Sequence, residues 1–96
     1  MKLISGFLHE SLVDRVTDLL RSMDIPDLQF EVSQVAPRSR TTHNPGLSNV
    51  YFRLEIYVSD EDHLRAAEAL KRAIPLSVAT KVRLYVIDVA EVLDIN

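Results

Sequence analysis

Cysteine is absent from this 96-residue sequence, and glycine occurs only twice. Without cysteine the chain can form no disulfide bond, no thiolate nucleophile and no cysteine-ligated zinc site, which fits a reducing compartment. Two glycines are too few for the glycine-rich loops that hold phosphate groups in many nucleotide-binding proteins. These absences exclude several common kinds of functional site.

Long hydrophobic runs and an excess of positive charge are also missing. The first apolar run, at residues 2–8, is far too short to span a bilayer, and no small-residue cleavage site follows it. The 14 Asp and Glu residues outnumber the 11 Lys and Arg residues, giving a net charge of -3. This balance disfavours nucleic acid and anionic membranes as partners. We therefore expect a cytoplasmic protein that binds no nucleic acid.

The short chain is expected to form one domain, spanning residues 1–96, and to associate with copies of itself. Its 47% content of hydrophobic residues is typical of a globular protein. A domain of this size buries only about 60–70% of its unfolded surface. Because no disulfide bond supplements such a small core, association with other copies is the expected means of stabilisation.

Hydrophobic spacing predicts six secondary-structure elements. Apolar residues that alternate or run continuously predict four strands, at residues 2–8, 28–33, 50–58 and 81–89. The first of these is apolar on both faces, so we expect a central strand buried on both sides. Apolar residues at helical spacing predict two helices, at residues 12–23 and 64–74. We expect Ser11 and Ser59 to cap these helices, and residues 92–95 are a candidate short edge strand.

The resulting βαββαβ order predicts an α+β, ferredoxin-like fold. Two right-handed crossovers give a four-stranded antiparallel sheet with both helices on one face. The apolar stripe predicted for the second helix comprises Leu64, Ala67, Leu70 and Ile74. The opposite face of the third strand is predicted to carry Tyr51, Arg53, Glu55 and Tyr57. Since no third helix is available to cover that face, we expect subunits to associate across it.

A long connection at residues 36–49 separates the second and third strands, whereas hairpin loops usually have about 2–5 residues. Between residues 31 and 55 there are three arginines and no acidic residue, so this segment has a net charge of +3. Arginine donates paired hydrogen bonds to phosphate or carboxylate oxygens, and threonine hydroxyls can complete such a site. The candidate ligand-binding residues here are Arg38, Arg40, Thr41 and Thr42. A solvated loop kept soluble by its arginines is an equally open interpretation.

Histidines and acidic residues give little indication of metal binding or catalysis. His9, His43 and His63 share no short ligand spacing. His43 is the candidate metal ligand because it lies in the basic loop, whereas the other two histidines are expected to be structural. No serine belongs to a nucleophile motif with glycine and histidine, so we expect no enzyme. Asp88 is expected to accept backbone or helix-terminal hydrogen bonds at the end of its strand.

The order of elements and several short motifs resemble the PII signal-transduction proteins, the nitrogen regulatory protein P-II-like family. The resemblance covers nearly the whole chain. Its most specific part is the match at the last strand. The motifs that carry it are Lys2-Leu3-Ile4, the helix at 12–23, the break Asp24-Ile25, the long loop, and Asp88-Val89-Ala90-Glu91-Val92.

Resemblance to PII implies a homotrimer of ferredoxin-like subunits that binds small effectors in clefts between subunits. It also implies that residues 36–49 form the equivalent of the T-loop, which contacts a protein partner, with a membrane transporter as one candidate. An adenine nucleotide is one candidate effector, and a divalent metal ion is another candidate ligand. Residues implied to line the cleft are Arg38, Arg40, Lys81 and Arg83.

Arg83 is the best single candidate for an anion contact implied by this resemblance. It lies five residues before Asp88, where a lysine of the PII B-loop would fall relative to the same motif. Residues 75–81 lack the glycine- and aspartate-rich B-loop of members that bind ATP, so the chain resembles a divergent PII-like protein.

Two alternatives share the βαββαβ order. A CutA-like protein is also trimeric and is associated with divalent metal ions, and a loop containing His43 permits this interpretation. The second alternative is an ACT-like amino-acid-binding module or a small enzyme. ACT-like domains usually carry a glycine at the first strand-to-helix turn, where this chain has His9-Glu10-Ser11.

Overall fold

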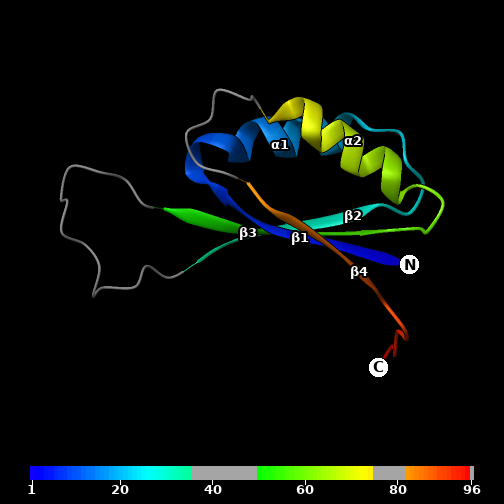
Figure 1. Cartoon of the computed structure of the whole chain (residues 1–96). Coiled ribbons are helices and arrows are strands. Elements are labelled where there is room, and N and C mark those ends of the chain that lie inside the picture. The colour runs from blue at the N-terminus through cyan, green and yellow to red at the C-terminus, as the bar shows by residue number, and fades with distance from the viewer. Residues whose placement is uncertain (36–49, 75–81, 96) are drawn as a thin grey trace.

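The computed structural model describes residues 1–35, 50–74 and 82–95 of the chain. Its elements are β1 (Lys2–His9), α1 (Glu10–Ser22), β2 (Gln29–Gln34), β3 (Tyr51–Val58), α2 (His63–Ala73) and β4 (Leu84–Asp88). The strands form one antiparallel sheet in the order β2-β3-β1-β4. Both helices lie on one face of this sheet (Figure 1). The predicted α+β class, with four antiparallel strands and two helices, is confirmed, and the strand order is that of a ferredoxin-like fold.

Alternate residues of the two central strands build the core. Because successive strand residues point to opposite faces, even-numbered positions of β1 and β3 face the helices. The residues excluded from solvent here are Ile4, Leu8, Leu54, Ile56 and Val58. They belong to the same apolar cluster as Val16 and Leu20 of α1 and Ala66 and Leu70 of α2. Hydrophobic burial therefore holds both helices against the centre of the sheet.

The first helix begins two residues earlier than predicted, and His9 rather than Ser11 is its N-cap. The Nδ1 atom of His9 accepts a hydrogen bond of 3.2 Å from the backbone N–H of Ser11, satisfying a donor that the helix itself leaves free. At the other end, the backbone N–H of Met23 donates to the carbonyl of Leu19 at 3.1 Å. The predicted end of this helix before Pro26 is therefore confirmed.

The buried stripe of α2 differs from the predicted one. Leu64, which was predicted to be buried, is 67% exposed, whereas Ala66 and Leu70 are fully buried. Two residues correspond to about 200° of rotation around a helix, so Leu64 lies on the side opposite Ala66. Ser59 was predicted to cap this helix, but the N-cap is Asp62. The Ser59 hydroxyl instead accepts from the Asp62 N–H at 3.3 Å and donates to its carboxylate at 3.1 Å, which stabilises the preceding turn.

The last strand is shorter than predicted, covering Leu84–Asp88, and residues 92–95 form neither strand nor helix. Beyond β4, the backbone N–H of Val89 still donates to the carbonyl of Met1 at 3.1 Å. In the ranges that the structure describes, neither helix has the length and apolar character needed to cross a membrane.

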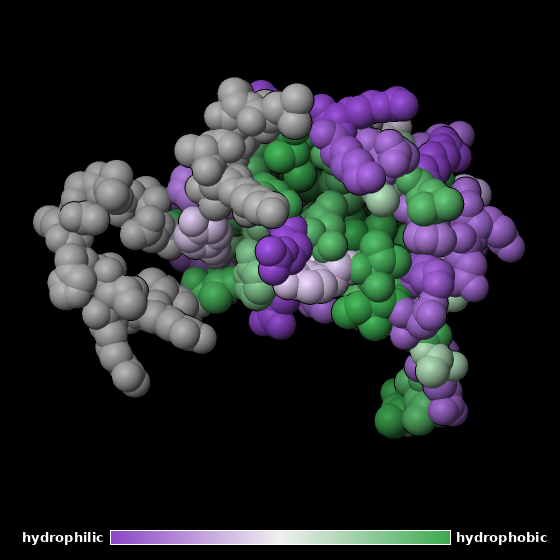
Figure 2. All heavy atoms as spheres, in the orientation of Figure 1, coloured by the Kyte–Doolittle hydropathy of each residue, from purple (hydrophilic) through white to green (hydrophobic). Residues whose placement is uncertain are grey.

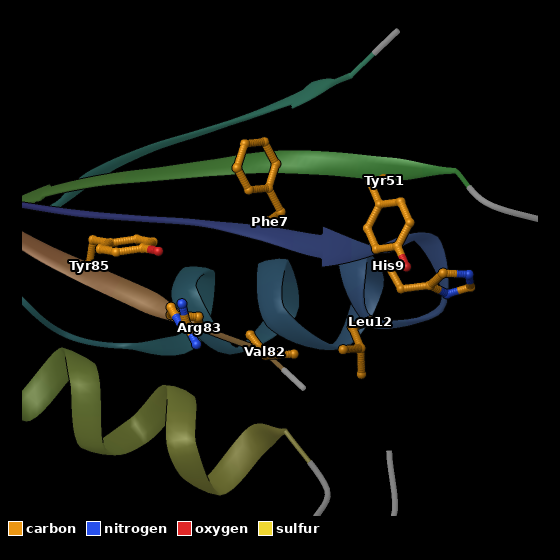
Figure 3. A pocket seen from close by; sticks show the side chains of 7 residues that line it. All are labelled: Phe7, His9, Leu12, Tyr51, Val82, Arg83 and Tyr85. Atoms are coloured by element: carbon orange, nitrogen blue, oxygen red, sulfur yellow. The ribbon is translucent and has the colours of Figure 1, made fainter. Parts of the chain in front are cut away.

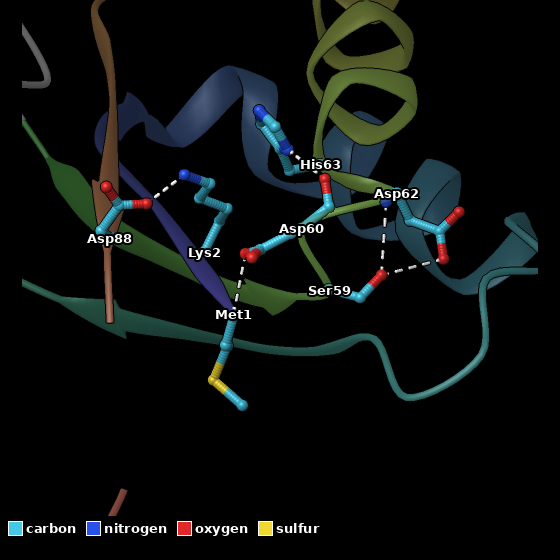
Figure 4. A network of polar contacts seen from close by, with 7 residues as sticks. All are labelled: Met1, Lys2, Ser59, Asp60, Asp62, His63 and Asp88. Carbon is cyan, nitrogen blue, oxygen red and sulfur yellow. Dashed lines mark hydrogen bonds and ion pairs between the residues drawn. The ribbon is translucent and has the colours of Figure 1, made fainter. Parts of the chain in front are cut away.

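Charged groups join the chain start to β4 and to the turn before α2 (Figure 4). Lys2 Nζ donates to the carboxylate of Asp88, which raises the pKa of Lys2. Asp88 thus accepts a hydrogen bond as predicted, but from a lysine side chain. The α-amino group of Met1 lies 2.8 Å from a carboxylate oxygen of Asp60, and this hydrogen bond lowers the pKa of Asp60. Asp88, Met1 and Asp60 are largely exposed and Lys2 is partly exposed, so each pair contributes little to stability.

Candidate functional site

Unequal strand lengths create a recess at one end of the sheet. On one side β1 pairs with β3 along its full length to His9. On its other side it pairs with β4 only as far as Gly6, which faces Leu84. In the described part of the chain, residues 7–9 therefore have no strand on their outer side.

A cavity of about 320 Å³ lies at this recess (Figure 3). Its walls come from β1, the start of α1, the start of β3 and the chain entering β4. The lining residues are Phe7, His9, Leu12, Tyr51, Val82, Arg83 and Tyr85. Small-molecule sites usually have volumes of about 300–1,000 Å³, so this cavity suits a small ligand.

Gly6 allows the chain entering β4 to approach this site. A Cβ atom at position 6 would lie 2.7 Å from the carbonyl oxygen of Arg83 and 2.8 Å from a methyl carbon of Leu84. Because real Cβ atoms essentially never come this close to backbone oxygen, a residue with a side chain would displace residues 83–84. The absence of a side chain at Gly6 therefore allows Arg83 to lie at the cavity.

Aromatic rings form much of the cavity wall. The ring of His9 stands edge-to-face against Tyr51, with centroids 5.5 Å apart and an interplanar angle of 84°. Phe7 and Tyr85 are each about half exposed, at 54% and 52%. Such rings bury apolar surface and stack on planar groups, so they favour a ligand with a flat apolar part.

Arg83 makes the cavity suitable for an anion. Among the described lining residues there is no Asp or Glu, and Arg83 is the one with a permanent charge. Among the described residues, none of the ion pairs includes Arg83, and its side chain is exposed. A guanidinium without a bound carboxylate can donate two parallel hydrogen bonds to a phosphate or carboxylate group.

The structure describes only one of the residues predicted from sequence to bind a ligand, namely Arg83. The other predicted residues, Arg38, Arg40, Thr41, Thr42, Lys81 and the candidate metal ligand His43, lie outside the described ranges. Arg83 lies at the cavity, with Val82 beside it and Tyr85 two positions along the chain.

Sequence reasoning missed the aromatic wall of the site. Residues 2–8 were predicted to be buried on both sides, which is wrong for Phe7. The two-residue period places Phe7 and His9 on the face away from the helices, and Tyr51 was correctly predicted to share that face. The sequence therefore indicated that these three rings share a face. Their contact with residues 82–85 depends on where β4 begins, which the sequence pattern does not give.

A metal site finds no support within residues 1–35, 50–74 and 82–95, where no three His, Asp or Glu side chains are grouped to hold an ion. His9 bonds to Ser11 at the start of α1. His63 Nδ1 lies 2.7 Å from the carbonyl oxygen of Asp60. Both contacts agree with the structural roles predicted for these two histidines.

Comparison of the sequence with protein-family models finds no match. Comparison with curated proteins finds none either. The function of the site is therefore argued from the chemistry of its own residues.

Proposed function

We propose that this chain is a PII-like regulatory protein that binds a small anionic effector at the cavity containing Arg83. Binding would change the population of conformations that the protein offers to a partner, since a ligand shifts an equilibrium toward the state it prefers. The site would thus sense an effector and control docking, and it would catalyse no reaction.

One observation carries this proposal: among the described residues, an arginine without an ion-pair partner lines a cavity together with the rings of Phe7, Tyr51 and Tyr85 and with no carboxylate. The absence of nearby negative charge favours an anion. The aromatic rings favour an effector that combines this anion with a planar ring. An adenine nucleotide has both parts, so it is the first effector class to test.

The proposed assembly is a homotrimer with the effector held at clefts between subunits. The sheet face away from the helices carries Phe7, Tyr51 and Tyr85, and no helix of the described ranges covers it (Figure 1). A second subunit against this face would close the cavity and exclude water from Arg83. Electrostatic contacts strengthen as water is excluded.

The proposed docking element is the connection at residues 36–49, which joins β2 to β3. Its two ends meet the described chain at Val35 and Val50. The backbone N–H of Val35 bonds to the carbonyl of Tyr51 at 2.9 Å, and Tyr51 lines the cavity. Tyr51 therefore links the cavity to this connection, so that a ligand in the cavity would influence the conformation of residues 36–49. An effector-dependent complex with a protein partner, such as a membrane transporter, is the expected readout.

Thermal unfolding in the presence of ATP, ADP, AMP, cyclic nucleotides and bicarbonate tests effector binding. A ligand at 100 times its Kd stabilises the folded state by about 2.7 kcal/mol. For a domain of this size that corresponds to a rise in Tm of roughly 10–20 °C. We expect one ligand class to produce such a rise, and we expect Arg83→Ala to abolish it.

Arg72→Ala is the matched control, because Arg72 is an exposed arginine on α2 outside the cavity. This variant should respond to the effector as the native chain does. An unchanged response in Arg83→Ala would remove Arg83 from the site. No response from the native chain to any of these ligands would contradict effector sensing.

A second pair of measurements addresses the basic loop and the trimer. Light scattering of the native chain should give three times the 10.9 kDa mass of one subunit. Replacing Arg38 and Arg40 with alanine should weaken the effector response while leaving this mass unchanged. A full response in that double variant would exclude these two arginines from the anion site.

A further inference from the structure

The edge strand β4 exposes apolar side chains on both of its faces. Tyr85, Val86 and Ile87 are 48–52% exposed, although they follow one another along the strand. Pairing with β1 places Tyr85 and Ile87 on the face away from the helices and Val86 on the helix side. Exposed edge strands usually carry charges or prolines that prevent further pairing, and these three positions carry neither.

A second exposed apolar segment follows directly after this strand. Residues 89–95, which we call the C-terminal arm, form no strand or helix. Within the arm Val92, Leu93 and Ile95 are 58–90% exposed. Figure 1 shows the arm leaving the body on the side of the sheet away from the helices, and Figure 2 shows apolar residues in this projection.

The arm and β4 each carry apolar side chains on both faces, with Asp94 between Leu93 and Ile95 in the arm. In an extended arm, Leu93 and Ile95 share one face and Val92 lies on the other. In β4, Tyr85 and Ile87 share one face and Val86 lies on the other. Side by side as strands, the two segments would bury apolar groups against each other on both faces.

The arm is also long enough to pair with the whole of β4. Seven extended residues reach roughly 23 Å, whereas the five residues of β4 span roughly 16 Å. The arm can therefore run along the whole of β4 and still leave residues for the connection.

The start of the arm directs it away from its own β4. The N–H of Val89 donates to the carbonyl of Met1, so the chain continues in the strand direction past the beginning of β1. In this position the arm leaves the outer edge of its own β4 uncovered. The structure thus presents an apolar edge and an apolar arm on one chain without joining them.

From this arrangement we propose that the C-terminal arm of each subunit lies along the exposed edge of β4 in a neighbouring copy of the same chain. The inference rests on the homo-oligomer of the proposed function and names the segments that hold it together. Each copy both gives and receives an arm, so the contact joins two different surfaces. Such a contact closes into a ring of three when neighbouring copies are related by a third of a turn.

Cross-linking between single-cysteine variants tests this contact, because the native chain has no cysteine. Val86→Cys marks the middle of β4, and Leu93→Cys marks the arm. The two variants, one of them bearing an affinity tag, are mixed, allowed to exchange subunits and treated with a short bifunctional maleimide. We expect a covalent product that joins the tagged and untagged chains through positions 86 and 93.

Leu64→Cys is the matched control for position 86, since Leu64 is an exposed leucine on α2. Mixed with Leu93→Cys it should give no such product. A Val86→Cys product with itself that exceeds the mixed product would overturn the proposal in favour of direct β4-to-β4 pairing. Absence of the mixed product from an intact oligomer would also overturn it.

The mass of serine variants separates this inference from the proposed function. Leu93→Ser should lower the mass toward that of one subunit at micromolar concentration, whereas Leu64→Ser should leave it unchanged. A Leu93→Ser variant with the native trimer mass would remove the arm from the interface while leaving the trimer and effector binding in place. A native chain that is already monomeric would overturn both the arm contact and the trimer.

Discussion

The carbonyl oxygen of Arg83 lies 2.7 Å from the point that a Cβ atom on Gly6 would occupy. This contact joins the middle of β1 to the chain that enters β4, and it brings Arg83 to the edge of the cavity. One residue without a side chain therefore determines how closely a cationic side chain approaches the aromatic wall.

Gly6→Ala is expected to destabilise the fold by about 1–3 kcal/mol, because the clash is with backbone rather than with a flexible side chain. Alanine in a strand would otherwise gain up to about 1 kcal/mol over glycine, so the steric term has to exceed that gain. Urea unfolding measures the difference. Ser5→Ala, on the opposite face of the same strand, is the control. A Gly6→Ala variant as stable as Ser5→Ala would show that residues 83–84 yield easily.

Leu70→Ala should cost about 2–5 kcal/mol, because Leu70 is fully buried between α2 and the sheet. Leu64→Ala should change stability by less than about 0.5 kcal/mol, since that side chain is mostly exposed. Comparing the free energies of unfolding of the two variants tests which face of α2 packs against the sheet. Similar losses in both variants would favour the stripe predicted from the sequence.

His9→Ala should cost about 0.5–2 kcal/mol through loss of the N-cap of α1, together with the edge-to-face contact with Tyr51. His9→Asn keeps a side-chain acceptor for the Ser11 N–H but removes the ring. We expect its free energy of unfolding to lie between those of the native chain and His9→Ala. Equal losses in the two variants would assign the whole effect to the ring contact.

Asp60 predicts a small dependence of stability on pH in acid. Its pKa is lowered from the ordinary value of 3.8 by the hydrogen bond from the Met1 α-amino group. The ion pair therefore stabilises the folded state above that value, and the contribution is lost as the pH falls through the lower folded-state pKa. NMR titration of the Asp60 carboxylate measures the folded-state value directly. Acetylating the α-amino group should return it toward 3.8, and an unchanged titration would contradict this pairing.

The order of elements followed from the sequence because each signal is local. Period-two alternation at residues 50–58 reports directly which side chains face the core, and β3 has that alternation. Pro26 acts on its neighbour alone, so the end of α1 was predictable. The cap of α1 was not, because serine is the commoner cap and the His9 bond to Ser11 depends on how the chain leaves β1.

For the candidate site, too, some features were predictable from the sequence and others were not. Its charge was predictable: Arg83 was the candidate anion contact, five residues before Asp88, and the structure has it at the cavity. Its shape was not, because the cavity exists only where β4 stops pairing with β1 at Gly6. That end point depends on a contact between residues 77 positions apart in the sequence.

The sequence by itself determined the βαββαβ order, the apolar faces of the central strands and the acidic overall charge. These depend on residue types and on spacings of two to four positions. Only the tertiary structure decided that Leu64 points outward, that Phe7 and Tyr85 share a cavity with Arg83, and that no other described strand pairs with the apolar outer edge of β4. Each of these follows from strand register and helix rotation, which packing between distant segments sets.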